Sequence, residues 1–531
     1  MESKQTPDSN RGTEEQKKDH GNRFKEALTQ RRGFVYTLEL VPGRGSRGET
    51  IEQVLDMAQR AAAGGRVHAV SITDNPGGRP ALAPEAIGLE VLHFGIDPII
   101  HFTCRDKSRN QIESALYGLD RVGLRNILAI TGDYPEGESK PVFDLDSVQL
   151  LQFATQMNAG LENDVKVPGA GTRVPPTALF KGCAVSPFKQ LESETMAQYF
   201  KLLKKVRAGA DFAITQVGYD VRKFDELLRV MRSYNIDVPV IGNVFVLSLG
   251  TARVMNRKLI PGCVVTKALV EQLECESRQP DKGKAARFVR AAKLIAVLRG
   301  LGYSGAHIGG PNLKYEDVER IIVTSEELTP SWREYVQEFS FPQENGYYLF
   351  QKDDETGLNS DVPSVRTNHG GKIPGYALMR FFHRVVFDLE APLYGAARAF
   401  YRALEGTRFE EHFGVLEHFI KIITSRCRKC GDCALSDIAF LCPHSQCPKH
   451  LLNGPCGGSS EGWCEVYPGK RRCIYVKAYE RLKIYGEEES LKETYVPPCN
   501  WQLNQSSSWA NYFLGKDHSA NNKCGKEPAK S

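Results

Sequence analysis

The chain has 531 residues, 41% of them hydrophobic, and a formal net charge of +5 at pH 7. This length and apolar content can bury a large core and predict more than one domain. The charge is the small difference between 69 basic and 64 acidic residues, so it gives no case for nucleic-acid binding. No apolar run approaches the roughly 18 to 20 residues that a transmembrane helix needs, and we expect no membrane span and a cytoplasmic protein with reduced thiols.

The first 25 residues are polar, charged and almost without apolar side chains. Burial in this stretch cannot offset the entropy lost on ordering, so residues 1–25 are expected to form a disordered tail.

From Gly33 onward, short apolar runs alternate with segments of helical periodicity. The expected strands are residues 33–40, 67–74, 97–104, 125–133, 177–185, 210–218, 238–246 and 305–310. The clearest helical segments are residues 49–65, 84–95, 110–123, 193–209 and 223–235. Eight strand candidates in about 290 residues, most of them followed by a helix, predict a closed (β/α)8 barrel over residues 26–328.

An open, doubly wound sheet is the rival architecture. It is disfavoured because no G-x-G-x-x-G follows the first strand. Polar residues also recur at the expected carboxyl ends of the strands, which form the active face of a barrel. These residues are Glu39, Thr73, Asp74, His101, Thr103, residues 131–133 and Gln216.

Residues 329–424 are expected to connect the barrel to a further domain. A polar, turn-rich loop over residues 344–374 precedes three helical segments at 376–388, 392–406 and 413–426. These helices are expected to pack the following domain against the barrel. Their aromatic stripe of Phe381, Phe382 and Phe387 predicts a core rather than a cofactor site.

Eight of the fourteen cysteines lie between Cys427 and Cys473, spaced C-x2-C-x2-C-x8-C-x4-C-x8-C-x7-C-x8-C. Thiolates two residues apart can converge on one metal, and eight are enough for two four-cysteine sites. The opening triple favours a [4Fe-4S] cluster over zinc, and both remain open. The expected ligands are Cys427, Cys430, Cys433, Cys442, Cys447, Cys456, Cys464 and Cys473.

A metal-binding domain is therefore predicted over residues 425–496, closed by a helix at 474–486. His444 and His450 lie inside it and could replace a thiolate, although each also fits a surface histidine. A disulfide-stapled extracellular module is disfavoured because no apolar signal segment precedes the barrel. Residues 497–531 are expected to form a polar tail, in which Cys499 and Cys524 receive no role.

Five motifs of the predicted barrel resemble those of the methylenetetrahydrofolate reductase family, and the likeness runs over about residues 33–328. They are YTLELVPGRG at 36–45, SITDNPGG at 71–78, HFTC at 101–104, AITGDYP at 129–135 and AGADFAITQ at 208–216. Their order and their placement at successive strand ends make the combined match specific. The cysteine-rich region also resembles the carboxyl-terminal domain that accompanies such reductases in bacteria and is linked there to metal clusters.

The resemblance implies a flavin, FAD or FMN, across the carboxyl-end face and a folate substrate. Glu39 matches the family's acid, and Asp133 matches the carboxylate that contacts the pterin and tunes the flavin. Without such roles, Glu39 is a strand-end carboxylate and Asp133 a turn residue. The flavin-contacting positions correspond to Thr73, His101, Thr131, Gly132, Asp133, Lys204 and Lys205, and Gln216 corresponds to a folate-contacting one.

The sequence departs from the family pattern at three places. Thr131 stands where many relatives have arginine, and Gln198 and Lys201 replace the acidic and amide residues that often hold the adenosine end of FAD, which favours FMN. Residues 244–256 lack the usual glutamine and aromatic of the nicotinamide site. Direct reduction by NAD(P)H is therefore disfavoured.

The expected function is flavin-dependent reduction of 5,10-methylenetetrahydrofolate to 5-methyltetrahydrofolate, with electrons passing from a donor protein through iron-sulfur clusters. The alternatives are an NAD(P)H-dependent reductase with a structural zinc domain, and a non-catalytic interaction protein on a degenerate barrel. A homo-oligomer is left open.

Overall fold

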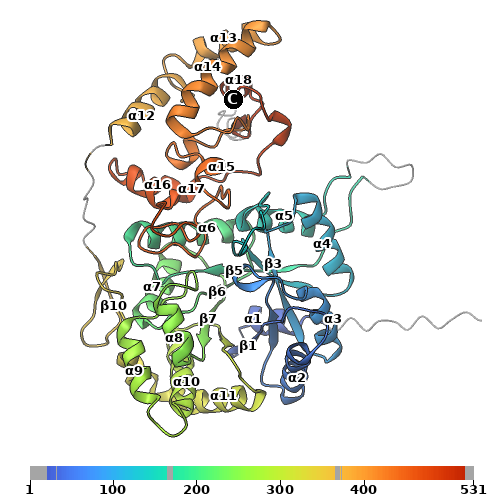
Figure 1. Ribbon diagram of the computed structural model, residues 1–531, viewed down its shortest axis with the longest axis vertical. Coiled ribbons are helices and arrows are strands. Elements are labelled where there is room, and N and C mark those ends of the chain that lie inside the picture. The colour runs from blue at the N-terminus through green and yellow to red at the C-terminus, as the bar shows by residue number, and fades with distance from the viewer. Residues whose placement is uncertain (1–20, 32, 164–171, 365–370, 372, 521–531) are drawn as a thin grey trace, which may run out of the picture.

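The computed structural model describes residues 21–31, 33–163, 172–364, 371 and 373–520. Eight parallel strands close into a barrel in chain order (Figure 1), and β1 pairs with β8 through registers such as Leu38↔Ile308. The predicted (β/α)8 architecture is confirmed. The strands are β1 (Val35–Leu40), β2 (Ala69–Ile72), β3 (Asp97–Thr103), β4 (Asn126–Ile130), β5 (Phe180–Val185), β6 (Phe212–Thr215), β7 (Val240–Phe245) and β8 (Gly305–Gly309).

Helices surround this barrel, because parallel strands need crossover connections that cover the outer face of the sheet. They are α2 (Glu49–Gly64), α3 (Pro84–His93), α4 (Arg109–Arg121), α5 (Ser147–Ala159), α6 (Glu192–Arg207), α7 (Val221–Ser233), α8 (Leu249–Asn256), α9 (Lys267–Glu276), α10 (Lys284–Leu301) and α11 (Tyr315–Leu328).

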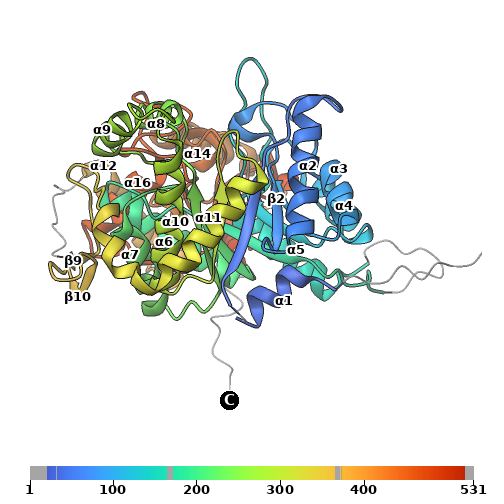
Figure 2. The ribbon, with the colours of Figure 1, turned by 90° about the horizontal axis from the view of Figure 1, so that it is seen from below.

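A short helix, α1 (Arg23–Thr29), lies beside the start of β1 (Figure 2). Its Phe24 and Leu28 are buried against residues at the amino-terminal ends of the strands, and the ring centroids of Phe24 and Phe212 are 5.3 Å apart. The predicted disordered tail is therefore wrong for residues 23–25, because they begin a helix whose Phe24 and Leu28 fill one end of the barrel. Residues 1–20 of that prediction lie outside the described residues.

The connector is more structured than the sequence suggested. After η2 (Thr329–Phe339), the expected loop contains an antiparallel pair of strands, β9 (Phe350–Lys352) and β10 (Asn359–Pro363). The buried Asn359 side chain donates hydrogen bonds to the carboxylate of Asp225, at 2.9 Å, and to the carbonyl of Arg222. This asparagine anchors the pair on α7, so the prediction of a loop without strands is wrong for this part of residues 344–374.

The three expected connector helices are present as α12 (Pro374–Val386), α13 (Tyr394–Leu404) and α14 (Arg408–Ser425). They stand away from the barrel (Figure 1), and it is α16 (Ile474–Lys483) and α17 (Ser490–Glu493) that contact α6. The expected packing of the connector helices between the two parts is therefore wrong. The aromatic stripe is also divided, since Phe387 is buried whereas Phe381 and Phe382 are 67% and 47% exposed.

The segment after α17 packs back onto the chain as far as residue 520. It forms η4 (Trp501–Leu503) and α18 (Ser508–Leu514), and the buried Phe513 stacks on Tyr401 with ring centroids 5.3 Å apart. The expected polar tail is wrong for this part, and Cys524 lies outside the described residues. No helix among the described residues combines the length and apolar character that crossing a membrane requires.

Candidate functional site

Glu39 lies near the carboxyl end of β1, at the mouth of the barrel. Its carboxylate lies over the neighbouring strand end, because a Cβ added to Gly309 of β8 would be 2.8 Å from Glu39 Oε2. The glycine thus leaves room for this acid. Burial raises the pKa of Glu39 to about 7, because the uncharged carboxyl is favoured away from water. The group can therefore hold a proton near neutral pH.

Three further predicted residues are buried around the same mouth: Thr73, His101 and Thr131. His101 Nε2 is 2.9 Å from Ser71 Oγ, and burial lowers the pKa of His101 to about 4, so its ring is neutral. The hydroxyl of Thr73 is buried and has no hydrogen-bond partner among the described residues. A bound ligand with a polar group could satisfy that hydroxyl.

The loop after β4 is locked to the loop after β2. The Gly77 N–H donates to Asp133 Oδ2 at 2.8 Å, and Arg105 donates to the carbonyl of Asp133 at 2.8 Å. Gly132 has φ +91°, and a Cβ there would lie 2.9 Å from the Cβ of Arg105. Asp133 is exposed at the mouth of the barrel. Its carboxylate also holds the loop after β2 through the hydrogen bond from Gly77.

Gln216 follows β6 and contacts a cysteine that the sequence reasoning missed. Cys263 Sγ lies 3.7 Å from Gln216 Oε1. The pKa of Cys263 is raised to about 12 by burial and further by the carboxylates of Glu39 and Asp133. Cys263 therefore lies near both predicted catalytic carboxylates. Cys263 lies in the loop between α8 and α9, which contains no recognisable motif, so the sequence did not indicate that this residue belongs to the site.

Lys204 and Lys205 are buried in the last turn of α6. Burial lowers the pKa of each to about 8, and Lys205 donates to the carbonyl of Ala184 in β5 at 2.5 Å. Both remain largely protonated at pH 7, which suits an anionic group. The structure brings Lys205 to the end of β5 and does not show that either lysine contacts the other predicted residues.

The cysteine-rich region docks directly on α6. Gln198 donates to the carbonyl of Cys456 at 2.8 Å, and Lys201 donates to that of Pro455 at 3.0 Å. Lys189, just before α6, donates to the carbonyls of Gly457 and Ser459, the latter at 2.7 Å. The resemblance implies that positions 198 and 201 hold the adenosine end of FAD in many relatives, whereas here Gln198 and Lys201 bind protein backbone.

Lys449 of the cysteine-rich region contacts the mouth of the barrel. No sequence motif indicated this residue. Its ammonium is buried, forms an ion pair with Glu465 and donates to the carbonyl of Gly132 at 2.7 Å. The Lys449 ammonium and the Glu465 carboxylate lower the cost of each other's burial. One lysine therefore connects the cysteine-rich region to the loop that carries Asp133.

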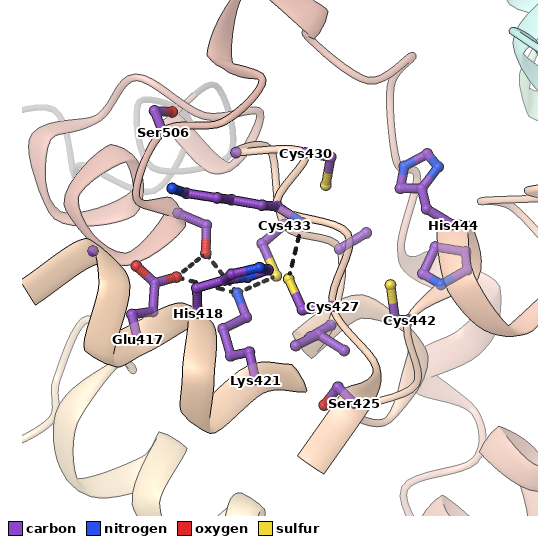
Figure 3. Close-up of a pocket in the computed structure, with 17 residues that line it drawn as sticks. Glu417, His418, Lys421, Ser425, Cys427, Cys430, Cys433, Cys442, His444 and Ser506 are labelled. Atoms are coloured by element: carbon purple, nitrogen blue, oxygen red, sulfur yellow. Dashed lines mark hydrogen bonds and ion pairs between the residues drawn. The ribbon is translucent and has the colours of Figure 1, made fainter. Parts of the chain in front are cut away.

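The eight expected metal ligands fall into two groups of four in chain order. Cys427, Cys430, Cys433 and Cys442 line one pocket (Figure 3), and Cys447, Cys456, Cys464 and Cys473 line another. No disulfide joins the cysteines of the described residues. In the first pocket, Lys421 Nζ is 3.1 Å from Cys433 Sγ, and the N–H of Lys429 donates to Cys427 Sγ at 3.3 Å. Such donors suit sulfur atoms that carry negative charge, as metal-bound thiolates do.

Comparisons with known proteins agree on both parts of the chain. A family model described as methylenetetrahydrofolate reductase matches residues 23–323, and one described as methylene-tetrahydrofolate reductase C terminal matches residues 407–502.

Two curated relatives match the barrel part. "Methylenetetrahydrofolate reductase 1" of Schizosaccharomyces pombe is 28% identical over 214 residues, which cover 39% of this chain and 32% of that protein. "Probable methylenetetrahydrofolate reductase (NADPH)" of Caenorhabditis elegans is 26% identical over 226 residues, covering 41% and 31%. The chain spans about a third of the length of these relatives.

Among solved structures, an uncharacterized protein from Clostridium thermocellum, which binds two copies of 5-methyl-5,6,7,8-tetrahydrofolic acid, is similar with a TM-score of 0.41. The identity is 14%, and the match covers 58% of this chain and 99% of that protein.

Proposed function

The chain belongs to the methylenetetrahydrofolate reductase family, and we propose that it reduces 5,10-methylenetetrahydrofolate to 5-methyltetrahydrofolate with a bound flavin. When bound, a flavin supplies the hydride and can accept electrons singly. Opening the five-membered ring of the substrate also requires a proton for the leaving nitrogen. The observation that carries the proposal is the Glu39 carboxyl at the barrel mouth, whose pKa of about 7 lets it donate that proton.

The residues at the mouth fit a flavin with a polar ring. Thr73 presents a buried, unpartnered hydroxyl, and Gly132 leaves backbone accessible where a side chain would collide with Arg105. We propose that Thr73, His101, Thr131, Gly132 and Asp133 hold the flavin, that Lys204 and Lys205 favour its phosphate, and that Gln216 contacts the folate.

We propose FMN rather than FAD as the bound form. An adenosine group would need partners along α6, and the two side chains expected there, Gln198 and Lys201, already bind the carbonyls of Cys456 and Pro455. The docked cysteine-rich region therefore competes for the place of a second nucleotide. A shorter cofactor that ends at its first phosphate avoids this competition.

The cysteine-rich region is proposed as the place where electrons from a donor protein enter. The second group of thiols, which includes Cys447 and Cys456, shares its pocket with Lys449 and Glu465. Lys449 in turn reaches the carbonyl of Gly132 at the barrel mouth. Four thiols within such a pocket fit a [4Fe-4S] cluster, which transfers one electron at a time.

A second candidate keeps the same reaction but takes electrons from NAD(P)H, with zinc in the cysteine-rich region. The name of the Caenorhabditis elegans relative, which specifies NADPH, favours it. Anaerobic incubation of the purified chain with a reduced viologen dye and methylenetetrahydrofolate tests the reaction common to both candidates. We expect 5-methyltetrahydrofolate, and flavin-loaded protein that forms none would contradict the proposed reductase activity.

Asp133→Asn removes one negative charge at the mouth, where positive charge develops on the folate. A unit charge at close range contributes about 1–4 kcal/mol, so we expect folate affinity and turnover to fall by about tenfold or more. The flavin potential should rise, because a nearby carboxylate disfavours the anionic reduced flavin. Titrations of folate affinity and of flavin potential check this, and a mutant unchanged in these two quantities would leave the Asp133 side chain with only its hydrogen bond from the Gly77 N–H.

Lys449→Met removes the cation that binds Glu465 and Gly132. Breaking a buried pair costs about 3–5 kcal/mol, because the remaining charge stays buried without its partner. We expect a lower melting temperature and loss of flavin during gel filtration. The matched control is Lys470→Met, at an exposed lysine of the same region. Equal melting and flavin retention in the two variants would show that Lys449 does not couple the parts.

A further inference from the structure

Cys499, to which the sequence analysis assigned no role, lies beside two of the residues in the first thiol pocket. The sulfur atoms of Cys430 and Cys499 and a ring nitrogen of His444 all lie within 4.8 Å of one another. The three residues are only 9%, 4% and 6% exposed, respectively. They come from separate turns of the cysteine-rich region and from the segment after α17, so folding alone brings them together.

The ring of His444 is an independent observation that points to a ligand at this place. Both of its ring nitrogens are buried, and neither has a hydrogen-bond partner among the described residues. A buried polar atom without a partner is costly, and an imidazole has two such atoms. Cys430 lies on the side of the pocket toward His444, while Lys421 contacts Cys433 (Figure 3).

We propose that Cys430, His444 and Cys499 bind a single zinc-like divalent cation. Two thiolates and an imidazole are a ligand set that zinc prefers. On a tetrahedral ion with metal–sulfur bonds of about 2.3 Å, two sulfur atoms lie about 3.8 Å apart, which agrees with a group contained within 4.8 Å. Each thiolate of a cubane binds a different iron, so such ligands lie farther apart.

This assignment separates Cys430 from the group of four that its spacing suggested. Cys427, Cys433 and Cys442 remain as the other thiols of the pocket. Three protein ligands leave the fourth position of the ion to water.

The surroundings of Cys499 place the proposed ion between the segment after α17 and the rest of the molecule. Arg109, at the start of α4 in the barrel, donates to the carbonyl of Cys499 at 3.0 Å. The next residue, Asn500, donates its backbone N–H to Asp432 of the cysteine-rich region at 2.8 Å. An ion held by Cys499 and Cys430 would join this late segment to the cysteine-rich region at the point where both meet the barrel, so metal binding would contribute to folding.

Metal content tests the proposal without reference to catalysis, so its failure is distinguishable from failure of the proposed reductase activity. The full chain is purified without oxygen, and zinc and iron are counted per chain. We expect one zinc-like ion per chain in addition to any iron. Cys499→Ser and His444→Gln should each lower retention of that ion against a chelator by tenfold or more, with iron unchanged. Cys275→Ser, at an exposed thiol of α9, is the matched control and should retain both metals.

A variant that preserves ligation covers the case in which these substitutions prevent folding. His444→Cys replaces the imidazole by a third thiolate, so the Co²⁺-loaded protein should keep its metal and absorb more strongly in the thiolate charge-transfer region than Co²⁺-loaded native protein. Three results would overturn the proposal: native protein without a zinc-like ion, loss of iron rather than zinc in Cys499→Ser, or an unchanged Co²⁺ spectrum in His444→Cys.

Discussion

Glu39→Gln is expected to lower the rate of methylenetetrahydrofolate reduction by about 100-fold or more, the usual cost of losing a general acid. Glutamine keeps the shape of the side chain but has no acidic proton. Flavin content should not change, because Glu39 is expected to contact substrate rather than the cofactor. Turnover with a reduced dye, measured as 5-methyltetrahydrofolate formed per flavin, gives the comparison.

The pH dependence supplies a second readout for the same residue. Burial raises the pKa of Glu39 to about 7, and the acid is active when protonated, so turnover should decline as pH rises through that value. The decline should be absent from the residual activity of Glu39→Gln. Glu52→Gln, on the exposed face of α2, is the control and should match the native profile. A Glu39→Gln protein with near-native turnover would exclude the acid role.

Cys456→Ala is expected to abolish turnover supported by a one-electron donor protein. Cys456 belongs to the second group of thiols, whose pocket includes Lys449, and its carbonyl is held by Gln198 of α6. Removal of one of four thiolates should lower iron content and interrupt the path to the barrel. Reduction by a small dye that reaches the barrel mouth directly should persist.

The matched control is Cys275→Ala, which deletes an exposed thiol of α9. That variant should keep its iron and both activities. Iron loss without loss of donor-linked turnover in Cys456→Ala would assign the second group of thiols a structural role and favour the NAD(P)H candidate.

The barrel could be predicted because its strands are buried on both faces. The run at residues 238–246 is nearly continuous in apolar residues, and runs of this kind alternate with helical segments. Polar side chains are tolerated where these runs end, which is why Glu39 and Thr73 could be placed at the mouth from sequence. The observed strands lie within the predicted ranges.

The contacts between distant segments could not be predicted in the same way. Lys449 and Cys499 are single residues in irregular segments, and their partners Gly132 and His444 are far away in sequence. No periodicity or spacing marks such a pair, because its geometry exists only after the chain has folded. The burial of Phe24 was not predicted for a related reason. A seven-residue helix with one buried ring is too short to show helical periodicity in the sequence.

The route by which electrons enter the native chain can be measured by supplying it with different electron donors. Protein purified without oxygen is analysed for flavin and iron and then supplied with methylenetetrahydrofolate and either a low-potential one-electron donor or NAD(P)H. We predict iron in the protein and 5-methyltetrahydrofolate formed with the one-electron donor, with little formed from NAD(P)H. Full turnover with NAD(P)H by protein that contains zinc and no iron would contradict it.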